Sequence, residues 1–424
     1  MPAESTGAAF HGHVKPVVPD PLDEIIRIEG GQVLATLIRL TGDIDLAEDA
    51  LQDAILTAAE VWKRDGLPNS PGAWLTTVAR NRALDVLRRE SRRAPKEEAA
   101  FRELTDSPAY PSLDDSVGDD VLRLLFTCCH PALSEEARVA LALRTVCGLT
   151  TVDIARVHVV PEATIGQRIS RAKAKIANAH IPYRVPPAHE LPDRLAAVLQ
   201  VIYLVFTAGH HAPVGELAGR VDLAAEGLRL GRLMVSLMPD EPECVGLTAL
   251  MLATHARRAT RVDAAGEFVV LADQDRRRWD HEMIAEASQM VESILRRRKP
   301  GAYQIQAAIA CLHSIAPSLE QTDWPQIVVL YRLLEERWAT PVVRVNLAVA
   351  IAQVDGPAAG LRALEKLEGS AIERWHLYWA TVADFERRLG NGHSAAAAYR
   401  RALGCQPNDT DRRFLEKRLA ALPT

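Results

Sequence analysis

Apolar residues recur at every third or fourth position along most of this 424-residue chain. That spacing is the period of an amphipathic α-helix, whereas a half-buried strand alternates at every second residue. Aromatic residues, which favour strands, make up only 5% of the chain, and pairs of hairpin-turn residues are few. We therefore predict an all-α fold.

Two proline-bearing segments interrupt this pattern and divide the chain. Proline removes a backbone donor and clashes with the preceding turn, so neither segment can be one long helix. The prolines are Pro95, Pro108 and Pro111 in the first segment and Pro182, Pro186, Pro187 and Pro192 in the second. The predicted organisation is a disordered tail at 1–21, a helical unit at 22–92, an acidic linker at 93–120, a second unit at 121–180, a linker at 181–192 and a large helical domain at 193–424.

Composition is typical of a protein from a reducing compartment. The net charge is −5, so any basic surface that binds nucleic acid must be local. Six cysteines lie without framework spacing, which suits the cytosol better than secretion. We find no apolar signal-peptide core in 1–21 and no apolar run near the ~20 residues of a membrane span. We expect a soluble, cytoplasmic protein without a membrane segment.

The first unit contains a helix with one acidic face. Asp43 can cap this helix, because its carboxylate can accept from the free backbone amides of the first turn. The apolar stripe is Leu46, Ala50, Leu51, Ala54, Ala58 and Val61. The opposite face carries Asp45, Glu48, Asp49, Gln52 and Asp53. Taken alone, such a face is either simply solvated or a docking surface.

A loop at 65–72 leads into a second helix, with Pro71 in its first turn. Trp74, Leu75, Val78, Ala79, Ala83, Val86 and Leu87 form its predicted buried stripe. Arg80, Asn81 and Arg82 lie between these residues, and Arg88, Arg89, Arg92 and Arg93 follow them. A basic stripe of this kind can neutralise phosphates, although a solvated helix end has the same composition.

The second unit predicts a helix-turn-helix. Ser134 caps one helix and Gly148 ends it; Thr151 begins a short helix, and a basic helix follows Pro161. The apolar contacts between the helices would be Ile154, Ala155, Val160, Ile165 and Ile169. The exposed residues Glu162, Thr164, Gln167, Arg168 and Arg171 would face DNA. An ordinary helical hairpin is the alternative, since His158 occupies a turn position where Gly is usual.

Together these stretches resemble the extracytoplasmic-function sigma factors, the smallest relatives of sigma-70. The segment Asp45 to Ala54 is similar to the family's region 2.2, and Trp74 to Asp85 resembles regions 2.3 and 2.4. Leu149 to Ala155, continued by Ala163 to Lys173, resembles region 4.2. The motifs follow the family's order within residues 22–180.

The resemblance implies a factor that binds RNA polymerase core and directs promoter recognition. Region 2.2 would dock on the clamp helices of the largest subunit, with the flap of the second-largest subunit as a further contact. Regions 2.3 and 2.4 would melt and read the −10 element, the loop 65–72 would hold a flipped-out base, and region 4.2 would read the −35 element. The implied core-binding residues are Asp45, Glu48, Asp49, Gln52 and Asp53. The implied DNA-binding residues are Asn69, Trp74, Arg80, Asn81, Arg82, Arg88, Arg89, Thr164, Gln167, Arg168, Arg171 and Lys173.

In this family the linker between the two DNA-binding units threads through the polymerase towards the RNA exit channel. Five linker aspartates with no base among them could mimic nucleic acid in a basic channel: Asp106, Asp114, Asp115, Asp119 and Asp120. A disordered, solvated linker has the same composition.

The remainder resembles a subgroup of these factors that has a long C-terminal extension. The resemblance rests on Phe126 to Pro131, Val205 to His210 and Leu271 to Asp280. In that subgroup the extension is thought to replace a separate anti-sigma protein, which implies a regulatory domain and possible regulatory protein partners. The spacing of Gly390, Ala395, Tyr399, Ala402 and Pro407 also matches half a tetratricopeptide repeat, so we expect a TPR-like helical domain.

Two residue clusters invite a metal or ligand interpretation. Cys128 and Cys129 are adjacent and follow an apolar run, which favours burial over chelation. Asp273, Asp275 and Asp280 in the arginine-rich loop could bind a ligand, but capping and pairing are commoner roles. No phosphate-binding glycine loop or zinc-protease motif is present, so we expect neither an enzyme nor a cofactor.

Three alternatives remain open at this level. A helix-turn-helix regulator could bind DNA without polymerase, but it leaves the acidic face at Asp45 to Asp53 unexplained. A TPR-like adaptor could carry the front half as a remnant. A ligand-binding or enzymatic C-terminal domain is the third, and it would show itself by a stabilising metabolite or metal.

Overall fold

The computed structural model describes residues 21–91, 113–158, 160–210, 223–263, 267–297, 300–365, 367, 371–407 and 409–422. Over these residues the fold is all-α, as predicted, and the one β-feature is an isolated bridge between Val262 and Phe268. The tail at 1–20 and most of the acidic linker lie outside the described residues.

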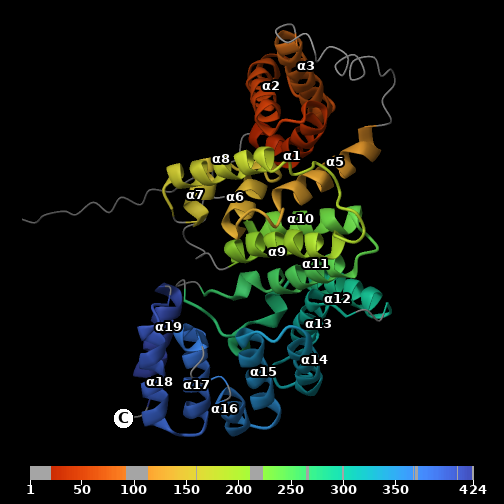
Figure 1. Cartoon of the computed structure of the whole chain (residues 1–424). Helices are drawn as coiled ribbons and strands as arrows, with labels where there is room; N and C mark the ends of the chain where they lie inside the picture. Colours follow the sequence, from red (N-terminus) through yellow and green to blue (C-terminus); the bar gives the residue numbers. More distant parts are fainter. Residues whose placement is uncertain are drawn as a thin grey trace, which may run out of the picture.

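The N-terminal unit packs three helices together, and the second and third lie side by side (Figure 1). They are α1 (Pro21–Thr41), α2 (Ile44–Asp65) and α3 (Pro71–Ser91). Asp43 caps α2 as predicted, because its carboxylate accepts from the amides of Asp45 at 2.7 Å and Leu46 at 3.0 Å. The buried stripe of α2 runs one position off the predicted one at its ends, since Ala47 and Trp62 are buried while Leu46 and Val61 are only partly so.

The second unit lies directly beneath the first (Figure 1). It consists of α5 (Leu113–Cys128), α6 (Glu135–Thr145), α7 (Thr151–His158) and α8 (Glu162–Asn178). Ser134 caps α6 by accepting from the Ala137 amide, and Gly148 takes a positive φ of 67° after the helix ends. Ile154, Ala155, Ile165 and Ile169 are buried between the helices as predicted, and Val160 is half-buried.

The remainder continues as stacked helices that curve into an arch (Figure 1). Its α-helices are α9 (Leu191–His210), α10 (Leu223–Leu237), α11 (Pro242–His255), α12 (His281–Leu295), α13 (Ala302–Ile315), α14 (Trp324–Arg337), α15 (Pro341–Val354), α16 (Pro357–Glu365), α17 (His376–Arg388), α18 (Gly392–Gly404) and α19 (Asp409–Ala420). Short 3-10 helices lie at η1 (Arg258–Thr260), η2 (Leu271–Asp273), η3 (Arg276–Arg278) and η4 (Ala371–Arg374).

One apolar core runs through both N-terminal units and into the extension. Buried residues from α1 to α3, α5 to α8 and α9 to α13 form a single contiguous cluster. Arg194 of α9 donates to the Phe126 carbonyl of α5 at 2.7 Å, and Gln200 donates to Glu135 of α6 at 2.7 Å. The first helices of the extension are therefore packed into the same core as the helix-turn-helix unit.

Two predictions about the segment around α9 were wrong: the end of the second linker and the absence of a long apolar run. Helix α9 begins at Leu191, so Pro192 lies in its first turn, where a missing N–H costs nothing, rather than in a linker. The segment Leu191–Gly209 is also long and apolar enough to span a membrane, contrary to our reading of the sequence. In this fold its apolar surface packs in the protein core, where Val198, Ile202 and Phe206 are buried.

The end of the predicted acidic linker is helical and not free. Helix α5 begins at Leu113, and Asp120 is completely buried within it. Its carboxylate accepts from Arg39 of α1 at 2.8 Å and from Arg123 at 3.1 Å. Tyr183, in the second linker, donates its hydroxyl to the Ala35 and Asp120 carbonyls at 2.9 and 2.8 Å. Asp120 therefore joins the two units and is removed from the proposed mimic of nucleic acid.

Replacing Asp120 with Asn should destabilise the protein by about 1–3 kcal/mol, because a buried arrangement of charged hydrogen bonds loses its anion. The Arg39 side chain is 40% exposed and can recover some hydration, which favours the lower end of that range. Urea unfolding of the full chain measures the effect. Asp49→Asn, on the exposed face of α2, is the matched control and should leave the midpoint unchanged.

Candidate nucleic-acid and polymerase interface

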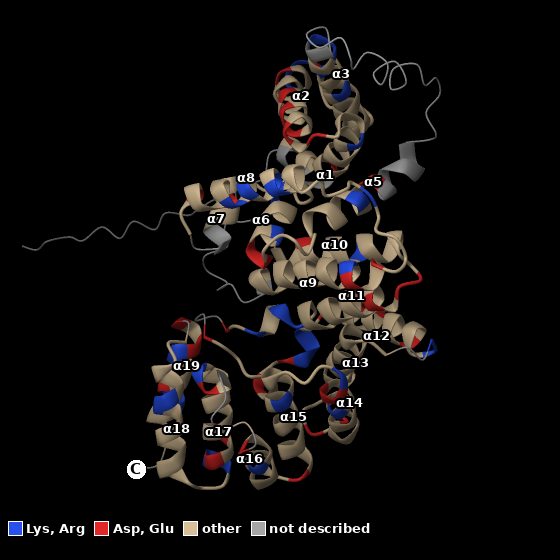
Figure 2. Cartoon of the chain, viewed as in Figure 1, with Lys and Arg blue, Asp and Glu red and all other residues tan. Residues whose placement is uncertain are grey.

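The acidic face of α2 is only partly open to solvent. Asp45, Asp49 and Gln52 are exposed, whereas Glu48 and Asp53 are half-buried. Figure 2 shows acidic residues gathered along α2 and basic ones along the neighbouring α3. Arg82 of α3 donates to Asp53 at 2.6 Å, so these two predicted site residues neutralise each other instead of presenting separate charges.

Helix α3 and the loop before it carry the remaining predicted residues of the first unit. Asn69, Asn81 and Arg89 are exposed, and Arg80 is half-buried. Trp74 stacks edge-on against Trp62 with ring centroids 5.3 Å apart, which holds its ring at the start of α3. Arg88 lies 3.7 Å from Asp85 one turn earlier, an exposed pair that contributes little to stability.

An open hollow between α2 and α3 includes a residue that sequence reasoning missed. Asp53, Asn81 and Arg82 line it together with Leu56. Leu56 is 59% exposed, although it belongs to a helix with a well-packed apolar stripe. Its position off that stripe was the available signal in the sequence, because it places an apolar residue on a polar face.

The helix-turn-helix residues are arranged as the motif predicts. Gln167 and Arg171 are exposed on α8, and Thr164 and Arg168 are half-buried on the same helix. Neither Arg168 nor Arg171 has a partner among the described residues. Glu162 instead accepts from the Thr151 hydroxyl at 3.0 Å, so it ties α7 to α8. The side chains of Arg168 and Arg171 are therefore available to phosphates or base edges.

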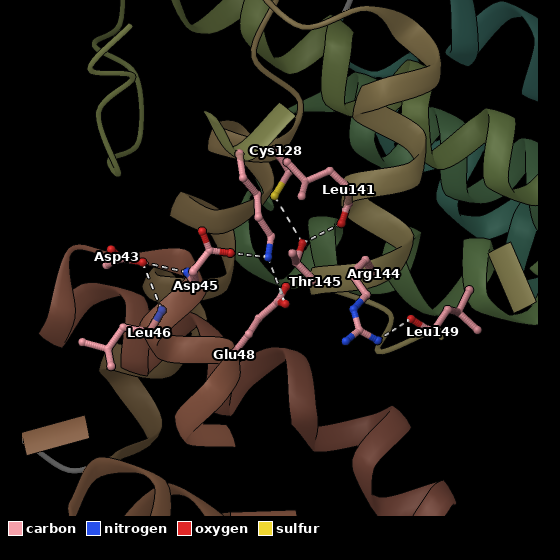
Figure 3. Close-up of polar contacts among 10 residues, drawn as sticks. Asp43, Asp45, Leu46, Glu48, Cys128, Leu141, Arg144, Thr145 and Leu149 are labelled. Atoms are coloured by element: carbon pink, nitrogen blue, oxygen red, sulfur yellow. Dashed lines mark hydrogen bonds and ion pairs between the residues drawn. The ribbon is translucent and has the colours of Figure 1, made fainter. Parts of the chain in front are cut away.

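Lys173 does not project freely from α8. Its ammonium donates to the Asp45 carboxylate at 2.7 Å and to the Glu48 carboxylate at 3.0 Å, which joins α8 to the acidic face of α2 (Figure 3). The Lys173 side chain is only 13% exposed and that of Glu48 only 20%. The structure thus brings a predicted DNA-binding residue against two predicted core-binding residues. We call this contact the α2–α8 clasp.

Electrostatics keeps the clasp charged. Desolvation lowers the pKa of Lys173, but its hydrogen bond to Asp45 and the charge of Glu48 outweigh this effect, so the pKa lies above the ordinary 10.5. A group whose pKa is raised on folding stabilises the folded state below its unfolded pKa, and that contribution is lost as pH rises past the raised value. The clasp should therefore persist throughout the neutral range.

The residues considered for metal or ligand binding have structural roles. Cys128 and Cys129 are buried as predicted, and the Cys128 thiol lies 3.2 Å from the Thr145 hydroxyl (Figure 3). Burial raises the pKa of Cys128 to about 12, so the thiol stays protonated. Asp275 caps η3, and Asp280 caps α12 by accepting from the Met283 amide.

Known proteins resemble all three parts of this architecture. The sigma-70 region 2 family matches residues 25–93, the sigma-70 region 4 family matches 123–176, and a family of unknown function (DUF6596) matches 194–295. The RNA polymerase sigma-H factor of Pseudomonas aeruginosa is 31% identical over 162 residues, which cover 36% of this chain and 81% of that protein. The ECF RNA polymerase sigma factor SigL of Mycobacterium tuberculosis is 33% identical over 141 residues, covering 32% and 75%.

The chain belongs to the extracytoplasmic-function sigma factors. As a sigma factor it directs the initiation of transcription, and neither the polymerase-independent regulator nor the adaptor is favoured. An uncharacterised protein of Rhizobium meliloti is 43% identical over 392 residues, 92% of each chain, so that relative shares the extension as well. No solved structure matches this sigma factor significantly.

The clasp should contribute measurable coupling to the stability of the sigma factor. In a double-mutant cycle of Lys173→Met with Glu48→Gln, we expect about 1 kcal/mol of interaction free energy, because both side chains are mostly buried. Thermal unfolding of the full chain measures each corner. A control cycle of Lys175→Met with Asp49→Asn, two exposed residues on the same helices, should give none; equal coupling in both cycles would contradict the assignment.

Proposed function

We propose that this sigma factor binds core polymerase through the exposed face of α2 and reads promoter DNA through α3 and α8. The observation that supports the proposal is that Arg168 and Arg171 lie without partners among the described residues on the second helix of a helix-turn-helix, in a chain that also has the acidic helix α2. Arg168 and Arg171 would contact the −35 element, with Thr164 and Gln167 reaching base edges.

The first unit would serve the −10 element. Asn69 and Trp74 stand at the start of α3, where an aromatic ring and an exposed amide can hold an unstacked base. Arg80, Arg88 and Arg89 would neutralise phosphates along the same helix. Strand opening would use binding energy alone, with no chemistry by the factor.

Asp45, Glu48, Asp49, Gln52 and Asp53 would dock on the clamp helices of the largest subunit, and the second unit on the flap of the second-largest subunit. Exposed Leu56 lies beside this face and supplies an apolar anchor for the same contact. Because polymerase and promoters share one compartment, we place the protein in the cytoplasm.

The clasp conflicts with this docking and must open. Glu48, whose side chain is mostly covered, would have to leave Lys173 to contact a clamp helix, and Asp45 would have to give up part of its charge pairing. Lys173 also cannot reach a phosphate while it is held by α2. The described conformation is therefore a closed state, which polymerase would open by offering α2 a larger surface.

The extension would set how readily this opening occurs. Arg194 and Gln200 of α9 hold the helix-turn-helix unit by direct hydrogen bonds, and the shared apolar core reinforces them. We propose that the TPR-like helices beyond α13 regulate activity through this connection, either alone or by receiving a protein partner.

Run-off transcription by core polymerase with the full chain tests the promoter contacts. Arg168→Ala with Arg171→Ala should reduce transcripts at least tenfold, since each lost contact removes about 1 kcal/mol or more, while co-elution with core remains. Lys175→Ala, which removes an exposed charge from the same helix, is the control and should keep most activity. Full activity in the double variant, or a stable promoter complex without polymerase, would overturn this proposal.

A cleavable cross-link tests whether the clasp must open. In a Cys405→Ser background, Asp45→Cys and Lys173→Cys would be bridged by a short disulfide-containing bismaleimide. We expect the bridged protein to lose transcription, because the bridge holds α2 and α8 together, and to regain it after reduction. The unbridged form of the same variant is the reference. Equal transcription in both forms would show that polymerase accepts the closed state.

A further inference from the structure

Two arginines converge on one tryptophan where the extension turns into its arch. Arg257 follows α11, and Arg276 lies in η3. Their guanidinium carbons are 5.9 and 4.6 Å from the centre of the buried Trp279 ring. Trp279 is itself fixed, because its indole N–H donates to the Thr260 hydroxyl at 2.9 Å. Figure 2 shows this basic segment between α11 and the α15–α19 helices.

Arg257 is a partly buried cation without a counter-ion among the described residues. Its Nε is buried and has no hydrogen-bond partner in the protein, and no described carboxylate forms an ion pair with it. Burial, together with the neighbouring charges of Arg261 and Arg276, lowers the pKa of Arg257 to about 10. A buried charge is costly unless it is paired, so this arrangement is unusual for a purely structural residue.

Arg276 makes more hydrogen bonds than Arg257, yet one of its N–H groups also lacks a partner in the described part of the chain. Its Nη1 donates to the carbonyls of His313 and Ala316 at 2.8 and 2.7 Å, at the end of α13. Its Nη2 is buried with no partner, and so is Nδ1 of His313. Burial together with Arg257 and Arg276 lowers the pKa of His313 to about 4, so the imidazole is neutral at physiological pH.

The acidic residues near this cluster do not neutralise it. Asp411 of α19 acts on Arg261 but is bound to His376 at 3.0 Å. Glu320 acts on Arg276 from an exposed position, where solvent screens its charge. The exposed Asp275 pairs with Arg277 instead. The cluster therefore keeps excess positive charge inside a folded domain.

We propose that Arg257 and Arg276, backed by Trp279, form a binding site for a small oxyanion: the phosphate or carboxylate group of a metabolite. Guanidinium groups match both anions through paired N–H donors. The bound anion would offset the repulsion among the arginines. It would also act between α11, which belongs to the main core, and α19, which touches the preceding segment through Phe268 and Phe414 at 5.8 Å.

Thermal unfolding of the full chain tests the site directly. Inorganic phosphate and succinate are titrated separately against sodium chloride of equal ionic strength, which distinguishes the two sources of oxyanion. We expect at least one to raise Tm by about 2 °C or more near tenfold its Kd, with the shift growing with concentration. No response to either anion beyond that to chloride would overturn the proposal.

Arg257→Met separates binding from folding. Without anion this variant should unfold at a Tm equal to or above that of the parent, because a buried unpaired charge is replaced by an apolar chain of similar length. With anion it should lose the Tm rise. Arg278→Gln removes an exposed charge from η3 and should keep it. A low Tm for Arg257→Met without anion, or an equal loss of response in Arg278→Gln, would show a structural role or a general charge effect instead.

An effect of the anion on transcription depends on the proposed function of the extension, whereas binding of the anion does not. If the extension gates transcription, the active anion should change run-off yield from the parent by at least twofold and leave Arg257→Met unaffected. A Tm response without a transcription response would overturn the gating role and keep the site. The reverse result would place the anion's action elsewhere, for example on polymerase.

Discussion

A single apolar core is the constraint on which the rest of this sigma factor depends. The two N-terminal units and the first helices of the extension bury their apolar faces against one another, so neither unit is an independent domain on a flexible linker. Asp120 and Tyr183 reinforce this junction with hydrogen bonds between elements far apart in the sequence. A change in the extension can therefore reach the helix-turn-helix through α9 without a separate messenger.

Against that core, the α2–α8 clasp is weak. An ion pair at the edge of a protein contributes about 1 kcal/mol or less, whereas burying a single large apolar side chain contributes roughly 1.5–3 kcal/mol. Lys173 can thus leave Asp45 and Glu48 while the apolar contacts persist. Under the proposed function, the same carboxylates would bind either α8 or polymerase, and the two contacts would compete.

Local features such as helix caps could be predicted from the sequence, whereas contacts between the units could not. Asp43, Ser134 and Pro71 were readable as helix starts because their chemistry acts within one turn. The position of Arg168 and Arg171 on the outer side of α8 followed from helical periodicity. The partners of Lys173 and Asp120 could not be predicted, since they come from helices 81 to 128 residues away. Periodicity also could not show that the apolar run of α9 packs inside the protein, because burial depends on its neighbours. The domain limits, the TPR-like character and the individual site residues remain predictions.

The arginine cluster differs from the clasp in the signs of the charges that meet. In the clasp, opposite charges meet and each satisfies the other, so the closed state needs nothing further. Around Trp279, like charges meet inside the fold, and Arg257 keeps an unsatisfied donor there. Such an arrangement persists only because the surrounding helices hold it in place, and its energy falls when an anion arrives. The extension thus combines a stable connection to the promoter-reading units with a centre whose energy depends on a ligand, and these are the two physical elements that a regulatory domain requires.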